Sequence, residues 1–321
     1  MRTNTTDCLI LLHIMKTGGT TLARLLEQNV SADQAYFLRG VQSAEDVLTI
    51  PEETRNELRL LRAGHAPFGA HKYLSQNSTY VTMLRNPISR VLSLYYFIFF
   101  PPNKEPEREL MPLKQWVETA VVVENHQTQK MAGLKNDQHS SSREMLEKAK
   151  QNFHEHFSVV GITERFDESV MLMHHHLGLN HILYQSKNVN KNRPKKTIDP
   201  EIISIVKARN QLDLELYEYA NQQLDSQIAE IPSFSEELTL FHELNAQFTA
   251  AASASEEKGQ LLKRTRHRLK TLRKSREEFK LKLSHAEEKT RRLSARQRLF
   301  EKSKLAQLKQ LLKVSPFWKK P

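Results

Sequence analysis

The stretch "LHIMKTGGTTLARLLEQN" at residues 12–29 decides the fold of this chain and indicates its chemistry. It overlaps the apolar run 8–13, which has the length of a buried strand, and it continues into a helical pattern in which Leu22, Leu25 and Leu26 share one face. Between the two lie a lysine, two glycines and three threonines. A loop that joins a strand to a helix aims backbone N–H groups and the positive end of the helix at an anion. The stretch therefore predicts a phosphate-binding loop.

Each residue type in this loop contributes a different group to an anion site. Gly18 and Gly19 let the backbone approach closely, Thr20 and Thr21 supply hydroxyl groups, and Lys16 adds a positive charge. In the nucleoside triphosphatase loop G-x-x-x-x-G-K-[ST] the lysine follows the glycines, whereas here it precedes them. No acidic residue suited to Mg²⁺ follows the next apolar run. We therefore expect a donor whose leaving group departs without a divalent metal.

Further strand and helix patterns follow along the chain. Residues 79–84 and 157–162 read as strands that each lead into a helix, and a short strand is expected at 181–185. Residues 199–230 read as a helix pair or one long helix. Strands that alternate with helices predict an α/β fold with a parallel sheet covered on both faces, and ligands bind such sheets at the carboxyl ends of the strands.

The charge of the chain is unevenly divided. The net charge is +11, yet residues 255–321 hold 22 Lys and Arg against 7 Asp and Glu, so residues 1–254 are slightly acidic. We expect a main domain at 1–245, a small, polar linker at 246–258, and a basic tail at 259–321 that forms a long helix or a coiled coil. A basic site in the main domain must therefore be local.

The sequence also allows predictions about the partners of the tail and the cellular location. A basic helix with the aromatic end "SPFWKKP" is suited to peripheral contact with an anionic membrane or a polyanion, or to a homodimer, and a nucleic-acid partner is not expected. The alternative is a solvated helix that packs on the domain. The single cysteine, Cys8, is expected to be a buried core thiol. The lack of a signal-peptide pattern and of an apolar run long enough for a membrane anchor favours the cytoplasm over the Golgi.

Two motifs resemble those of a known family. The segment "HIMKTGGTTL" at 13–22 resembles the 5′-phosphosulfate loop of sulfotransferases that use 3′-phosphoadenosine 5′-phosphosulfate (PAPS). The carbohydrate branch with the heparan sulfate 2-O-sulfotransferases reads H-I-P-K-[TS]-G-G-T-[TS]-L, so Met15 is the one departure. The segment "YVTMLRNPISRVLSLYYF" at 80–97 resembles the 3′-phosphate motif of the family. Further similarity lies, in family order, at 63–71, 124–133, 160–170 and 199–220.

The resemblance implies a fold, a co-substrate and a set of residues. The fold is an α/β P-loop-like three-layer sandwich with a central parallel sheet, and PAPS is bound without a metal. Arg85 and Ser93 stand where the family holds the 3′-phosphate, and an arginine at a strand end suits bidentate contact with phosphate. The residues matched to the 5′-phosphosulfate are Lys16, Thr17, Gly18, Gly19, Thr20 and Thr21.

The expected reaction needs a base for the attacking hydroxyl and a cation at the leaving oxygen. By resemblance His65 is the base, with His71 in reserve, and Lys16 is the cation. The family expectation for the acceptor is a carbohydrate hydroxyl. The alternatives are a P-loop small-molecule kinase and a catalytically inactive scaffold that acts through its basic tail.

Three other features leave their roles open. Asn125, Gln127 and Thr128 either contact the acceptor or form a capped helix start, and the basic loop 188–196 either covers the nucleotide or is a solvated turn. We interpret Arg90 as a helix-surface ion-pair partner and leave it outside the site.

Overall fold

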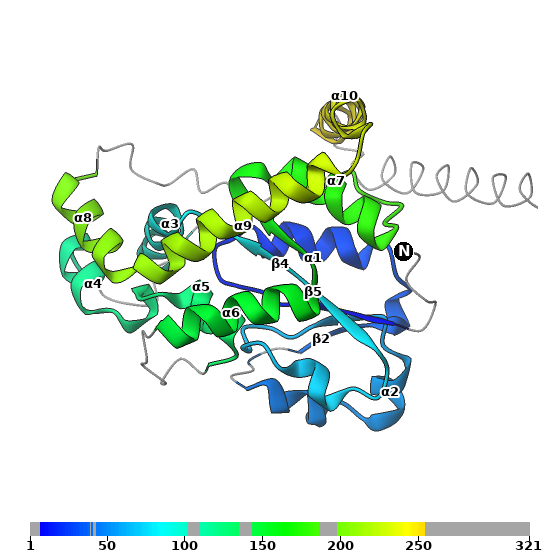
Figure 1. Ribbon diagram of the computed structural model, residues 1–321, viewed down its shortest axis with the longest axis horizontal. Helices are drawn as coiled ribbons and strands as arrows, with labels where there is room; N and C mark the ends of the chain where they lie inside the picture. Colours follow the sequence, from blue (N-terminus) through cyan, green and yellow to red (C-terminus); the bar gives the residue numbers. More distant parts are fainter. Residues whose placement is uncertain are drawn as a thin grey trace, which may run out of the picture. The chain divides into compact units, whose positions relative to one another are not determined.

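Five parallel strands form one sheet in the order β2-β3-β1-β4-β5 (Figure 1). The computed structural model describes residues 7–38, 40, 43–101, 110–134, 143–185 and 198–253. The parallel sheet predicted from the sequence is confirmed, and the basic tail lies outside the described residues. The strands are β1 (Cys8–Leu11), β2 (Ala35–Phe37), β3 (Leu60–Arg62), β4 (Ser78–Leu84) and β5 (Phe157–Ile162).

The central strand β1 is buried between its two neighbours, which made it recognisable in the sequence. Ile10 lies opposite Leu61 of β3 on one side and opposite Tyr80 of β4 on the other, and all three side chains are buried. A parallel strand that is covered on both faces reads as a continuous apolar run. β2 and β3 have only three residues each, too few to show such a run, and the sequence analysis missed them.

Helices cover both faces of the sheet (Figure 1). α1 and α7 lie over one face, α2 and α6 lie over the other, and α9 packs along β5 against both α6 and α7. Next to this core, α3, α4 and α8 surround a second apolar cluster that includes Val91, Trp116 and Val206. The helices are α1 (Gly19–Glu27), α2 (Glu52–Glu57), α3 (Pro87–Phe99), α4 (Leu113–Thr119), α5 (His126–Ala132), α6 (Arg143–His156), α7 (Phe166–Leu177), α8 (Pro200–Arg209), α9 (Gln211–Ala229) and α10 (Phe234–Ser253).

Short 3₁₀ turns complete the described elements. They are η1 (Ala32–Gln34), η2 (Ala44–Thr49), η3 (Ala70–Tyr73), η4 (Val121–Val123) and η5 (Thr163–Arg165). Within the described ranges, no helix is both long and apolar enough to cross a membrane.

The structure corrects one detail of the sequence analysis and decides between two alternatives in another. Residues 181–185 form no strand, because backbone groups of His181 and Tyr184 bond to the side chains of Asn29 and Asn245. Of the two alternatives for 199–230, the helix pair is confirmed, and it breaks at Asn210.

The helix α10 runs to Ser253, into the segment where the sequence predicts a linker, because Ala and Ser favour or tolerate helix. The chain divides into the compact units Met1–Thr249 and Ala250–Pro321. The boundaries of the linker and of the tail stay predictions.

A buried carboxylate fastens the short helix α5 to α9. Asp213 is fully buried, and its carboxylate accepts hydrogen bonds from the backbone N–H of Gln127 (3.1 Å) and from the backbone N–H (2.8 Å) and hydroxyl (2.7 Å) of Thr128. The side-chain oxygen of Asn125 accepts from the N–H groups of Leu212 (3.0 Å) and Asp213 (3.2 Å). The two helix starts thus satisfy each other's unpaired donors.

Replacing Asp213 should therefore destabilise the fold strongly. Asp213→Ala leaves three buried donors without their acceptor, and we expect a loss of about 3 kcal/mol or more in the free energy of unfolding measured with urea. The control is Asp225→Ala on the same helix, since the Asp225 side chain is 65% exposed in its ion pair with Arg165. That change should cost less than about 1 kcal/mol. Equal losses for the two variants would contradict the role assigned to Asp213.

Candidate active site

The candidate residues lie at one edge of the sheet because the strands are parallel. The loop 13–18 follows β1, the turn that carries His65 follows β3, Arg85 follows β4, and Thr163 follows β5. Carboxyl ends of parallel strands meet at the same edge, where α/β proteins bind ligands. The topology thus brings together segments that are far apart in the sequence.

The conformation of the loop after β1 is fixed by two residues in the left-handed region and by the hydroxyl groups of two threonines. Lys16 has a φ of 67° and Gly18 a φ of 81°, so the chain turns through the left-handed region twice. The Thr17 hydroxyl is buried and donates to the carbonyl of Ile14 (2.9 Å). The Thr163 hydroxyl lies 2.8 Å from the Thr17 carbonyl oxygen and 2.9 Å from that of Leu84. Thr17 therefore shapes the loop with its side chain, and its hydroxyl is not directed at a ligand.

The first turn of α1 presents its polar groups to this loop. Thr20 and Thr21 are half-buried, and their hydroxyls have no hydrogen-bond partner among the described residues. The first turn holds no acidic residue. Because the first N–H groups of a helix lack partners within the helix, the start of α1 offers donors and a positive potential to an anion.

Gly19 is required by a close approach of His13. The His13 ring packs so near that a Cβ built on Gly19 would lie 2.4 Å from His13 Cδ2 and 2.7 Å from Nε2. The other ring nitrogen, Nδ1, accepts from Arg62 Nε (3.3 Å) and Nη2 (3.1 Å). Burial, followed by the charge of Arg62, lowers the pKa of His13 to about 3. His13 is thus a neutral spacer between the loop and β3.

Arg85 is clamped by its backbone and turned toward the loop. Its N–H donates to the side-chain oxygen of Gln127, and the side-chain NH₂ of Gln127 donates back to its carbonyl, both at 2.8 Å. Its Nη1 donates to the Lys16 carbonyl (3.1 Å), and its Nε lies 3.7 Å from a carboxylate oxygen of Glu164. Arg85 therefore lies beside the loop 13–18.

Lys16 and Arg85 place two positive charges close together. The pKa of Lys16 is lowered to about 8, mainly by burial and secondly by the charge of Arg85. Lys16 Nζ lies 4.0 Å above the ring of Phe97 on α3. Ser93 is half-buried one helical turn before Phe97 and so lies on the same face of α3. The geometry thus brings Ser93 to the side of α3 that faces Lys16.

The two candidate bases occupy different surroundings. His65 Nδ1 lies 3.3 Å from the carbonyl oxygen of His13, its ring is 5.2 Å from the His13 ring, and one side is exposed to solvent. His71 instead packs against Tyr80 and His156, with its Nδ1 3.0 Å from the Tyr80 hydroxyl. Tyr80 and Phe157 form a pair near the amino ends of β4 and β5. His65 therefore lies at the edge that carries the loop, and His71 does not.

Other residues that shape the site were not singled out from the sequence, and one was misread. Arg90 was interpreted as a surface residue, yet it is fully buried, and its Nη2 donates to the carbonyls of Val122 and Val123 (both 3.3 Å). Gln127 and Thr128 are buried in bonds to Arg85 and Asp213, which favours the structural alternative for the 125–128 segment. Nothing in the sequence around Arg62 or Lys130 indicates a role in the site, since a single cation at the end of a strand or in a helix is common.

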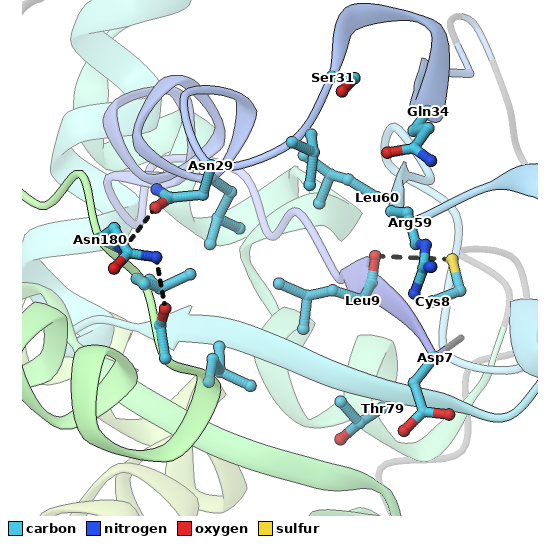
Figure 2. A pocket seen from close by; sticks show the side chains of 15 residues that line it. Asp7, Cys8, Leu9, Asn29, Ser31, Gln34, Arg59, Leu60, Thr79 and Asn180 are labelled. Atoms are coloured by element: carbon cyan, nitrogen blue, oxygen red, sulfur yellow. Dashed lines mark hydrogen bonds between the residues drawn. The ribbon is translucent and has the colours of Figure 1, made fainter. Parts of the chain in front are cut away.

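A separate pocket of about 410 Å³ opens at the opposite edge of the sheet (Figure 2). Its walls are the amino ends of β1, β3 and β4 and the carboxyl ends of α1 and α7. Asn29 and Asn180 lie on one wall, where Asn29 Oδ1 accepts from the backbone N–H of Asn180 (2.7 Å), and Arg59 lies on the other (Figure 2). None of the candidate site residues lines it.

Comparison with known proteins gives the family. Residues 1–220 match the sequence profile described as the sulfotransferase family. The chain belongs to the sulfotransferase family. Its relatives include heparan-sulfate 6-O-sulfotransferase 2 of Homo sapiens and of Mus musculus, each 25% identical over 269 residues. These alignments cover 67% of this sulfotransferase and 44% and 43% of the relatives, so the chain spans less than half of their length. The relatives bear the 6-O name, whereas the sequence motifs resemble the 2-O branch.

The contact between Gly19 and His13 can be tested by a double-mutant cycle in this sulfotransferase. Gly19→Ala should cost about 2 kcal/mol or more of unfolding free energy, because the new methyl group overlaps the His13 ring. In the His13→Ala background the same change should cost less than about 0.5 kcal/mol, which gives a coupling energy above about 1 kcal/mol. Urea unfolding of the four proteins measures it. The same cost in both backgrounds would show that the overlap is not what excludes alanine.

Proposed function

We propose that this sulfotransferase transfers the sulfuryl group of PAPS to a hydroxyl of a carbohydrate acceptor. The observation that carries the proposal is the meeting of Lys16, Arg85 and His65 at the edge of the sheet that holds the loop and the start of α1. Two cations beside free helix donors suit an anionic donor, and an imidazole at the rim suits an acceptor. The carbohydrate class rests on the names of the two relatives.

The donor would be held at its two phosphate ends. The loop at Gly18 and Gly19, with the first turn of α1 and the hydroxyls of Thr20 and Thr21, is suited to the 5′-phosphosulfate. Arg85, with Ser93 on α3, is suited to the 3′-phosphate, because a guanidinium binds phosphate through charge-assisted hydrogen bonds. Thr17 would contribute through its backbone alone, since its hydroxyl is used within the loop.

PAPS, when bound, supplies the sulfuryl group and a phosphate leaving group. His65 takes the proton of the acceptor hydroxyl while that oxygen forms its bond to sulfur. Lys16 faces the phosphate oxygen whose bond to sulfur breaks, and its ammonium stabilises the negative charge that develops there. The electron pair of the broken bond leaves with the phosphate, so the step needs no redox partner, and Lys16 takes the role that a metal cation would have at the leaving oxygen.

His65 is favoured over His71 as the base by position and by protonation. Burial is the main cause that lowers the pKa of His65, so its imidazole is neutral and able to accept a proton at physiological pH. His71 also has a lowered pKa, about 4, but its ring is packed between Tyr80 and His156 away from the loop. Membrane or polyanion contact through the tail, a homodimer and a cytoplasmic location stay predictions from the sequence.

The donor site is tested with the product nucleotide, 3′-phosphoadenosine 5′-phosphate. Calorimetric titration without divalent metal should show micromolar binding that Arg85→Ala weakens by about 2 kcal/mol or more, as expected for the loss of charged hydrogen bonds to phosphate. The control is Arg59→Ala, since Arg59 lies at the opposite edge of the sheet and should leave the affinity unchanged (Figure 2). Turnover with PAPS and heparan-type saccharides should disappear in His65→Ala while nucleotide binding remains.

Two outcomes would contradict the proposal. Absence of nucleotide binding, together with binding of ATP and Mg²⁺, would favour the kinase alternative. Nucleotide binding without turnover on any saccharide would favour the inactive scaffold or an acceptor of another class.

The lowered pKa of Lys16 predicts proton uptake on nucleotide binding. Near pH 8 about half of the Lys16 side chains are neutral in the free protein, because the pKa is about 8. A phosphate beside the amine favours the charged form and raises the pKa, so binding takes up roughly half a proton at pH 8 and weakens as the pH rises further. Calorimetry in buffers of different ionisation enthalpy measures this uptake.

Lys16→Arg is the matched control for this uptake. Arginine keeps the charge at every accessible pH, so the uptake near pH 8 should vanish in this variant while binding persists. Uptake of the same size in Lys16→Arg would assign the proton to another group.

A further inference from the structure

Lys130 is an unusual residue for a helix interior. Its side chain is only 2% exposed, and its Nζ donates to the carbonyl oxygen of His65 at 2.6 Å. Among the described residues no carboxylate forms an ion pair with it. Burying an ammonium group against one neutral acceptor costs free energy that a methionine of similar size would not incur. A buried cation retained at this cost points to a role other than packing.

Lys130 holds the turn of His65 at two points. Besides the side-chain bond to the His65 carbonyl, its backbone carbonyl accepts a hydrogen bond from the N–H of Phe68 (2.9 Å). Lys130 and Gln127 lie three residues apart on α5, and Gln127 clamps Arg85 through two hydrogen bonds. One buried helix therefore fixes both the phosphate-side arginine and the turn that carries the imidazole.

The groups that face His65 from the surrounding elements are few. His13, after β1, places its carbonyl oxygen and its neutral ring against the imidazole. Burial lowers the pKa of His65 most, and the bond to the His13 carbonyl raises it. The charges of Lys130, on α5, and of Arg62, at the end of β3, lower the pKa further. His126, also on α5, is fully buried with a pKa well below its usual value, so it is neutral. The positive charges beside His65 are thus Arg62 and Lys130.

We propose that Lys130 is a positioning residue for His65: its ammonium fixes the turn through the His65 carbonyl and places a positive charge beside the imidazole. The role of His65 as a base rests on the proposed sulfotransferase reaction. The effect of Lys130 on the position and pKa of His65 is independent of that reaction. Arg62 contacts uncharged rings, those of His13 and Phe37, so its charge also acts on His65, though less than that of Lys130. Lys130 differs from Arg62 because it also bonds directly to the turn that carries His65.

The test is an NMR titration of the His65 imidazole in the free protein, with the resonance assigned by its loss in His65→Gln. Lys130→Met removes the charge and keeps the shape, and the pKa of His65 should rise by about half a unit or more. Lys130→Arg keeps a charge and a donor and should leave the pKa close to that of the wild type. Lys150→Met is the control for removal of another lysine, since Lys150, on α6, lies over the ring of Tyr219 and is not among the charges that act on His65.

Each outcome decides the proposal without reference to turnover. A folded Lys130→Met protein with an unchanged His65 pKa would overturn it, and so would a wild-type pKa at or above the ordinary value of about 6.5. If the methionine variant does not fold, Lys130→Gln keeps a hydrogen-bond donor without the charge and should give the same rise.

Activity and nucleotide binding separate this proposal from the proposed function. With an active enzyme, the acid limb of kcat/KM should move to higher pH in Lys130→Met by the same amount as the NMR pKa, while affinity for 3′-phosphoadenosine 5′-phosphate stays within about twofold. A loss of activity at every pH with no movement of the limb would show a merely structural role. If the protein transfers no sulfuryl group at all, the NMR comparison still decides whether Lys130 controls His65.

Discussion

The carboxylate of Asp213 accepts three hydrogen bonds in the interior of the protein, and much of the site depends on them. They fasten the start of α5 to α9, and α5 in turn clamps Arg85 through Gln127 and the His65 turn through Lys130. The strands bring the segments to one edge of the sheet, but strand ends alone leave loops free to move. The buried helix converts this proximity into fixed positions, as preorganised sites require.

Several cations lie around this helix, with Glu164 beside Arg85 and Asp213 near Arg90 as acidic neighbours. Lys16, Arg85, Arg90 and Lys130 lie in or near the site, and burial lowers the pKa of both lysines to about 8. Two nitrogen atoms of Arg90, Nε and Nη1, have no hydrogen-bond partner among the described residues. Like charges in a medium of low dielectric constant repel one another, so the anionic donor proposed above would reduce this repulsion on binding. In the free protein the repulsion lowers the folding stability.

The parts of the structure that could be predicted are those marked by a pattern within a short segment of the sequence. β1, β4 and β5 are apolar runs, the loop between β1 and α1 has a distinctive order of residues, and Arg85 follows a strand directly. β2 and β3 are too short to show periodicity, and the small residues at 246–253 continue α10.

The residues that the sequence could not place act over long separations. Arg90 has helical neighbours typical of a surface position, and only the packing of α3 against η4 shows that it is buried. Lys130 stands 65 positions after the carbonyl that it binds, and Gln127 stands 42 after Arg85. No spacing rule connects such pairs, because the connection is made by tertiary contact.

The low pKa of Lys16 also has a consequence for reactivity. An amine that is about half uncharged near pH 8 is nucleophilic, whereas ordinary lysines remain protonated there. Lys16 is half-buried in the loop 13–18, while Lys130 is enclosed within the core. Lys16 should therefore be modified selectively. An aldehyde that bears a phosphate group would form an imine with the Lys16 amine faster than with the amines of the surface lysines.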